Sequence, residues 1–353
     1  MSIIFAILMF SVLIFVHELG HFMTAKLFGV QVNEFSMFMG PAIWKKQVGE
    51  TLYAIRCIPF GGYCAMEGED EDTDNPRSFQ KADWWKRVII LVAGSFMNLL
   101  TGIIIYCFLF LPESQIVEPA IVEFTECCTF NTEDGLRLDD VILQIDGEKV
   151  YSNADISTLL SFSPDGVHDL LIERDGEKLR FEDFAMTHLH ENEDGTTYRH
   201  YGFAFGKAVE ASLGQRMKFV WNTCLDNIRM VRLSLQMLFT GQAGLQDMSG
   251  PVGIVSQMSE IAQESETAKL AFLNLLSVCA FIAINLAVMN LLPIPALDGG
   301  RIAALLITVA IEKLIGRKID PKYEGYLHSA GMILLLGLMA IIMFKDVFFI
   351  LKG

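Results

Sequence analysis

Four apolar runs, each about as long as a membrane-spanning helix, dominate the 353-residue sequence. About 20 predominantly apolar residues are needed to cross a hydrocarbon core of roughly 30 Å. Runs of this kind extend from Ile3 to about Met23, from Val88 to Leu111, from Leu270 to Leu292 and from about Leu327 to Leu351. The sequence therefore predicts a polytopic α-helical membrane protein with four transmembrane helices.

Charged residues are distributed unevenly along the chain. Residues 112–267 contain 27 Asp and Glu but only 11 Lys and Arg, whereas the rest of the chain is nearly neutral. The overall formal charge of −15 would repel a nucleic-acid backbone, so we expect no nucleic-acid partner. We therefore expect membrane-embedded parts at 1–111 and 268–353, separated by an acidic soluble insert.

Lys and Arg near the apolar runs predict the orientation of the protein in the membrane. Residues 25–87 contain eight of them, and the connection after the third run contains five. Cytoplasmic loops are enriched in these residues, so both connections should face the cytoplasm. Both termini and the acidic insert are then extracytoplasmic.

The first apolar run has the length of a secretory signal sequence as well as that of a membrane span. No basic segment precedes it, no small-residue cleavage site follows it, and its end carries ionisable residues. We therefore expect this run to be retained as a membrane helix.

Residues 17–21 read His-Glu-Leu-Gly-His and close the first apolar run. Residues i and i+4 of a helix share one face, so His17 and His21 can bind one Zn²⁺ while Glu18 acts on water as the general base. A coincidental polar cluster at a helix end is the alternative. Ionisable groups at membrane depth are costly and usually functional, which favours the metal site.

A catalytic zinc ion usually has three protein ligands, so a third His, Asp or Glu is expected at similar depth. Asp298 stands out because it follows the third apolar run, within Asn-Leu-Leu-Pro-Ile-Pro-Ala-Leu-Asp-Gly-Gly-Arg at 290–301. Two prolines and two glycines predict a break in the helix, which membrane depth tolerates where the backbone is buried or lines a wet cavity. An ordinary turn at the end of the span is the alternative.

Together these two segments resemble the motifs of the site-2 protease family of intramembrane zinc metalloproteases, peptidase family M50. The PDZ-containing bacterial RseP/RasP-like branch is the most similar. Residues 58–63, 85–98 and 250–254 also resemble segments of that family, although Ser95 stands where the family commonly has proline.

The resemblance implies particular roles for the motif residues and a bacterial plasma (inner) membrane location. It implies zinc ligands at His17, His21 and Asp298, with Glu18 as the catalytic base. It also implies that Asn290, Pro293 and Pro295 help to hold an unwound substrate.

Residues 32–66 favour strands over a helix, and Gly40-Pro41 and Gly61-Gly62 predict turns. We expect a membrane-associated β-hairpin whose edge near Gly61 and Gly62 pairs with an extended substrate by strand addition. A plain cytoplasmic hairpin is the alternative. The acidic run at 67–74 is expected to be a solvated tip.

Residues 112–207 alternate short apolar runs with turns, as expected of a small α+β domain. The expected strands are 116–124, 140–145, 170–174, 179–184 and 201–205. The stretch 135–147 resembles a PDZ domain, with Asp139 in place of a usual glycine and without a clear carboxylate-binding loop. Capture of peptide ends and size filtering of substrates are the alternatives for this extracytoplasmic PDZ-like domain.

Residues 208–267 are expected to form an amphipathic helix and a connector between the insert and the third span. Apolar residues at helical spacing, interleaved with Lys and Arg, suit a helix at the membrane surface. Packing of this helix against the PDZ-like domain is the alternative.

Three hypotheses for function follow. The first is a zinc metalloendopeptidase of regulated intramembrane proteolysis, whose partners are membrane lipid and single-span substrates such as anti-sigma factors or remnant signal peptides. The second is a non-catalytic membrane PDZ scaffold, which the intact Glu18 disfavours because metal binding alone needs no base. The third is an ion transporter, which four spans without internal repeats disfavour. The sequence specifies neither the substrate nor the oligomeric state.

Overall fold

The computed structural model describes residues 2–69, 73–124, 135–161, 166–186, 188–191, 197–241, 244, 250–316 and 322–352. The chain divides into two compact units, which are described separately. Unit 1 comprises Met1–Ile105 and Met230–Gly353, and unit 2 comprises Tyr106–Arg229. Helices α2 (Trp84–Phe110) and α4 (Leu213–Thr240) each contribute residues to both units.

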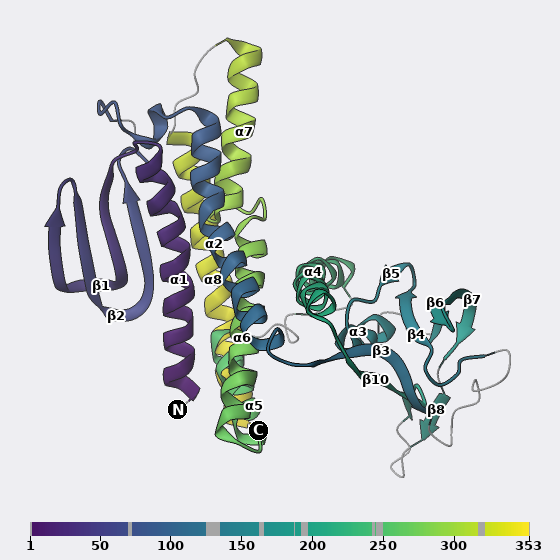
Figure 1. Ribbon diagram of the computed structural model, residues 1–353. Coiled ribbons are helices and arrows are strands. Elements are labelled where there is room, and N and C mark those ends of the chain that lie inside the picture. The colour runs from purple at the N-terminus through teal and green to yellow at the C-terminus, as the bar shows by residue number, and fades with distance from the viewer. Residues whose placement is uncertain are drawn as a thin grey trace. The chain divides into compact units, whose positions relative to one another are not determined.

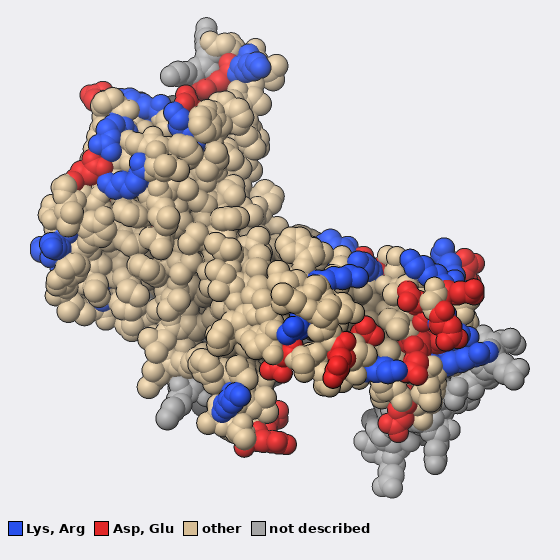
Figure 2. Space-filling view, in the orientation of Figure 1, with Lys and Arg blue, Asp and Glu red and all other residues tan. Residues whose placement is uncertain are grey.

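Four helices in the described part of the chain are long and apolar enough to cross a membrane, which confirms the four predicted spans. They are α1 (Ser2–Leu27), α2, α6 (Ala268–Asn290) and α8 (Lys322–Lys352), and they stand side by side in Figure 1. Unit 1 also contains α5 (Pro251–Glu264), α7 (Asp298–Ile315) and the short 3-10 helix η1 (Phe79–Lys81). On the face shown in Figure 2, uncharged side chains cover the middle of these helices, as contact with lipid requires.

Helix α1 is packed along its whole length. Its first half buries Ala6, Met9 and Leu13 against α5 and α6. Its last turns pack in a second apolar cluster that includes Phe35 of strand β1 (Val32–Val48) and Ile90 of α2. The helix that carries the His-Glu-Leu-Gly-His motif is therefore held on both sides of that motif.

Strand β1 and strand β2 (Thr51–Met66) form an antiparallel sheet in which the chain folds back on itself (Figure 1). Residues 34–37 of β1 have partners in two separate parts of β2, at 52–55 and at 62–65. Gly40 and Gly61 have φ angles of 83° and 82°, which favour glycine. Both predicted turn positions thus coincide with places where a long strand bends back, and the tight connection between the strands lies at Gly49.

Asp346, near the end of α8, caps the N-terminus of α5. Its buried Oδ2 accepts hydrogen bonds from the backbone N–H groups of Gly250 (2.9 Å) and Gly253 (3.0 Å). The first N–H groups of a helix lack partners within the helix, and a carboxylate there also interacts favourably with the helix dipole. Asp346, an acidic residue near the end of the last apolar run, therefore joins α8 to α5.

We expect Asp346→Ala to destabilise the protein by about 1–3 kcal/mol, because it leaves these two N–H groups without an acceptor. Asp346→Asn keeps a carbonyl oxygen in the same place and should lose less. Thermal unfolding in detergent, followed by circular dichroism, measures the difference. An Ala variant as stable as the wild type would show that the cap contributes nothing.

Unit 2 is built on a six-stranded sheet with strand order β10-β3-β4-β6-β7 and β5 paired to β4. The strands are β3 (Gln115–Phe124), β4 (Val141–Ile145), β5 (Glu148–Lys149), β6 (Val167–Arg174), β7 (Glu177–Ala185) and β10 (Phe203–Glu210). Helix α3 (Asn153–Ser161) and a separate pair, β8 (His188–Glu191) and β9 (Thr197–His200), complete it. Each strand expected in the insert is present, although the last begins at Phe203 rather than at Tyr201.

Within unit 2, α4 is fixed by a buried cluster of charged side chains around Arg229. Its guanidinium group donates hydrogen bonds to Asp155 of α3, to Asp226 of α4 and to the carbonyl oxygen of Lys149. One cation therefore faces two buried carboxylates. Burial, followed by repulsion from Asp155, raises the pKa of Asp226 to about 6.

This raised pKa predicts a pH-dependent local stability. The folded state binds a proton at Asp226 at a higher pH than the unfolded chain does, so the stability of this region falls as the pH rises toward 6 and stays low above it. Asp226→Asn removes the charge. We expect hydrogen exchange in α3 and α4 of this variant to be up to about tenfold slower than in the wild type at pH 7.5, but equal at pH 4.

The exposed Glu182→Gln variant serves as the control for loss of one negative charge and should exchange like the wild type at both pH values. The same ratio of wild-type to Asp226→Asn exchange rates at pH 4 and pH 7.5 would contradict the raised pKa.

Candidate metal centre

The two imidazoles of the His-Glu-Leu-Gly-His motif lie together on one face of α1. His17 and His21 are both buried, and their Nε2 atoms are 3.2 Å apart. Nδ1 of His21 is 2.8 Å from the carbonyl oxygen of Ile90 in α2. A carbonyl oxygen only accepts, so this contact places the proton of His21 on Nδ1 and leaves the lone pair of Nε2 available to a metal ion.

Asp298 is the first residue of α7 and reaches the histidines through a tight connection after α6. The predicted break is present, because α6 ends at Asn290 and the backbone then turns through hydrogen bonds such as Leu297 N–H to Ile294 O (3.1 Å). A Cβ would lie 2.2 Å from the Leu291 carbonyl oxygen at Gly299, and 2.2 Å from the Ile294 carbonyl oxygen at Gly300. Only glycine allows backbones to approach so closely.

The Asp298 carboxylate completes a triangle of ligand atoms. Its Oδ2 lies 3.2 Å from Nε2 of His17 and 3.4 Å from Nε2 of His21. In a tetrahedral zinc site with bonds of about 2.1 Å, neighbouring ligand atoms are about 3.4 Å apart. Oδ2 is also buried without a hydrogen-bond donor among the described residues. Two imidazole nitrogens and this oxygen fit a zinc ion and leave its fourth position open, as in catalytic sites.

Glu18 lies between the two histidines in the sequence and faces a cavity of about 600 Å³. The cavity is lined by the three candidate ligands and by residues of β2, α7 and α8. Cys64 of β2 also lines this cavity. Burial, and then the nearby Glu18 charge, raises the pKa of the Cys64 thiol.

The comparison with known proteins agrees with this geometry. The model of a family described as peptidase family M50 matches residues 5–338. The chain belongs to peptidase family M50. A Clostridium perfringens protein whose name includes the words zinc metalloprotease is 35% identical over 350 residues, which cover 99% of each chain. Zinc metalloprotease RasP of Oceanobacillus iheyensis is 28% identical and regulator of sigma-W protease RasP of Bacillus subtilis 26% identical, each over 98% of both chains.

This M50 peptidase is a zinc metalloprotease, and its cofactor is Zn²⁺. The expected family, enzyme class and cofactor are therefore confirmed. Its four apolar helices make it a membrane protein.

The five residues expected to contact substrate lie around this cavity rather than within its lining. A Cβ at Gly62 would be 3.7 Å from Cγ of Glu18, and Gly61 lies at the bend of β2. Asn290 ends α6 and is half-buried, and Pro293 is exposed. Pro295 lines a second, smaller cavity. Neighbours of these residues, such as Tyr63 and Ala296, line the main cavity.

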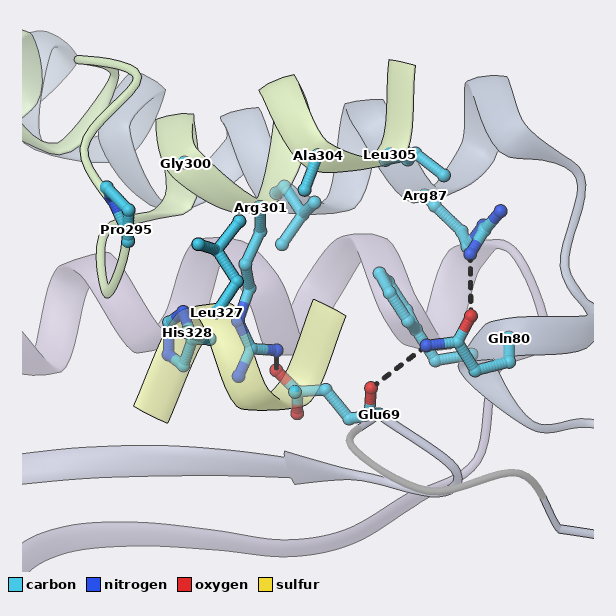
Figure 3. A pocket seen from close by; sticks show the side chains of 13 residues that line it. Glu69, Gln80, Arg87, Pro295, Gly300, Arg301, Ala304, Leu305, Leu327 and His328 are labelled. Carbon is cyan, nitrogen blue, oxygen red and sulfur yellow. Dashed lines mark hydrogen bonds and ion pairs between the residues drawn. The ribbon is translucent and has the colours of Figure 1, made fainter. Parts of the chain in front are cut away.

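A chain of polar contacts lies in the wall of the smaller cavity (Figure 3), and part of it is shared with the main cavity. Arg301 of α7 forms an ion pair with Glu69, and both residues line both cavities. Gln80 donates to the carbonyl oxygen of Glu69 (3.1 Å) and accepts from Arg87 of α2 (2.7 Å). The expectation of a solvated acidic tip is therefore wrong for Glu69, because a half-buried guanidinium stabilises it in the cavity wall.

His328 of α8 also lines both cavities, although no motif or spacing in the sequence singled it out. It follows Leu327, where the last apolar run was expected to begin, so its position in the sequence suggested a span end. The position of Arg301 in the sequence was a better indication that it lines the cavity than the position of His328, because Arg301 directly follows Asp298-Gly299-Gly300.

On the opposite side of the histidines, α1 and α2 are in direct backbone contact. A Cβ at Gly20 would lie 2.4 Å from the carbonyl oxygen of Ala93. A Cβ at Gly94 would lie 2.5 Å from Nε2 of His21 and 2.7 Å from Cε1 of His17. Both imidazoles therefore rest on the bare backbone of α2.

We expect Gly94→Ala to weaken zinc binding by about tenfold or more, because its methyl group would overlap both rings and displace their Nε2 atoms. Competition with a fluorescent chelator measures the zinc affinity. Gly337→Ala is the matched control, since a Cβ at Gly337 in α8 meets nothing within 4 Å. Equal zinc affinity in the wild type and Gly94→Ala would show that the rings are not held against α2.

Proposed function

We propose that this M50 peptidase performs regulated intramembrane proteolysis, in which it hydrolyses a peptide bond in or near the transmembrane segment of a single-span membrane protein. His17, His21 and Asp298 hold the zinc ion, and Glu18 is the catalytic base. The observation that carries the proposal is the triangle of ligand atoms, 3.2–3.4 Å apart, at the end of a helix apolar enough to cross a membrane.

The reaction needs a polarised carbonyl group and a base at one place. When bound, the zinc ion supplies a Lewis acid that polarises the scissile carbonyl group. Glu18 accepts a proton from the attacking water and donates it to the amide nitrogen as the carbon–nitrogen bond breaks, which leaves a carboxylate and an amine.

An unwound substrate fits the edge of β2 beside the cavity. A transmembrane helix hides its peptide bonds in internal hydrogen bonds and must become extended before water can attack. Residues 63–66 line the cavity, and the described partners of residues 62–65 belong to β1. A substrate strand added along 63–66 would bring a peptide bond close to Glu18.

The flanking motif residues would shape this path. Gly61 and Gly62 bend β2 and keep space beside Glu18. Asn290 ends α6, and Pro293 and Pro295 belong to the non-helical connection that carries Asp298, so these residues would bound the extended substrate on the opposite side.

The distribution of Lys and Arg supports cytoplasmic loops at 25–87 and after α6, so both termini and unit 2 would be extracytoplasmic. Unit 2 then acts as a PDZ-like domain that selects or filters substrates outside the bacterial plasma membrane. The name of the Bacillus subtilis relative refers to regulation of a sigma factor, which supports anti-sigma factors as substrates, beside remnant signal peptides.

We expect Glu18→Gln to lower cleavage of a reconstituted, tagged single-span substrate by about 10²–10⁴-fold, because glutamine cannot accept the proton from water. Zinc content should stay unchanged, since Glu18 is not a ligand. Cleavage in liposomes, followed by gel electrophoresis, measures the rate.

Glu260→Gln, which removes an exposed carboxylate of α5, should cleave like the wild type. Wild-type cleavage by Glu18→Gln would refute the role of Glu18 as base. No cleavage by any variant, together with retained partner binding, would favour the non-catalytic scaffold.

A further inference from the structure

Three residues of α2 lie in one line beneath the two imidazoles. Ile90, Gly94 and Asn98 are spaced four residues apart, so they share one face of the helix. Ile90 offers its carbonyl oxygen to Nδ1 of His21, and Gly94 leaves space for both rings. Asn98 is the last member of this line and lies beside His17.

The contact of Asn98 with His17 has no part in the chemistry described above. The Asn98 side chain is 1% exposed, and its Nδ2 lies 3.5 Å from Nδ1 of His17. Its Oδ1 is buried and has no hydrogen-bond partner among the described residues. A buried amide without good partners costs free energy, so an asparagine at this position needs a compensating interaction.

The protonation of a metal-binding histidine supplies that interaction. If Nε2 of His17 binds zinc, the imidazole is neutral and its proton is on Nδ1, which is then a donor. An amide NH₂ group cannot accept this proton, whereas an amide oxygen can. The oxygen and nitrogen of an asparagine are assigned from their hydrogen-bond partners, and exchanging them by a half-turn places Oδ1 next to Nδ1 of His17.

We propose that Asn98 is a positioning residue for the zinc site, whose side-chain oxygen accepts a hydrogen bond from Nδ1 of His17 and so aims Nε2 at the metal ion. Asn98 does for His17 what the carbonyl oxygen of Ile90 does for His21. Helix α2 thereby sets the tautomer and the orientation of both imidazoles without contributing a ligand. The inference rests on the proposed role of His17 as a zinc ligand.

The test compares two variants. Asn98→Leu keeps the size of the side chain but cannot accept a hydrogen bond, whereas the carboxylate of Asn98→Asp can accept hydrogen bonds but cannot donate them. Zinc affinity of the full-length protein in detergent is measured by chelator competition, and the absorption spectrum of the Co²⁺-loaded protein reports ligand geometry. We expect Asn98→Leu to weaken zinc binding by about 10–100-fold and to alter the Co²⁺ spectrum. Asn98→Asp should bind zinc within about threefold of the wild type or more tightly.

Ser95→Ala is the matched control, because Ser95 is equally buried one turn earlier in α2, and it should bind zinc like the wild type. Thermal unfolding without and with zinc separates positioning from packing. A positioning role reduces the zinc-induced rise in the unfolding midpoint of Asn98→Leu. A purely structural role lowers the midpoint without zinc and leaves that rise unchanged, which would overturn the proposal.

Two further outcomes are decisive. If Asn98→Leu does not fold, Asn98→Asp decides alone, since a folded Asp variant with more than about tenfold weaker zinc binding would show that His17 needs the NH₂ group. His17→Ala separates this inference from the proposed function. Wild-type zinc affinity in His17→Ala refutes the ligand assignment itself, whereas loss of zinc in His17→Ala but not in Asn98→Leu refutes only the role of Asn98.

Discussion

The direct backbone contact between α1 and α2 is the constraint on which the metal centre depends. Gly20 and Gly94 bring the two helices so close that the rings of His17 and His21 lie on the backbone of α2. Polar rings at membrane depth are costly unless they are enclosed and hydrogen-bonded, and this contact provides both conditions. The third candidate ligand atom, Oδ2 of Asp298, then comes from the start of α7.

The rest of unit 1 holds this arrangement in place. Apolar clusters pack α1 against α5 and α6 at one end, and against the sheet and α2 at the other. The folded-back strand β2 joins the wall of the cavity that Glu18 lines. The cavity that holds the candidate base is therefore walled partly by a sheet, while the candidate ligands come from helices.

The sequence predicted the features that depend on local pattern. The four spans follow from length and composition, and the pairing of His17 with His21 follows from helical spacing. Asp298 could be proposed because prolines and glycines mark a broken helix end. Five strands of unit 2 (β3, β4, β6, β7 and β10) were recognisable from their alternation and turns, whereas β5, β8 and β9 were not expected.

Contacts between distant parts of the chain were not predictable. Glu69 and Arg301 are 232 residues apart, Asn98 and His17 are 81 apart, and Asp346 and Gly250 are 96 apart. Periodicity and composition describe neighbours along the chain, so a single sequence carries no signal for such pairs. The bending back of β1 and β2 was likewise only partly visible, because turn residues mark a bend without specifying which segments pair across it.

The wall behind the two imidazoles has one further consequence. On that side the rings meet a carbonyl oxygen and the bare Cα of a glycine, neither of which can change rotamer. This surface of α2 therefore cannot adjust by side-chain movement and acts as a rigid support for the two imidazole rings. Any widening of the metal centre must originate on the opposite side, where Asp298 is carried by a short non-helical hinge between two helices.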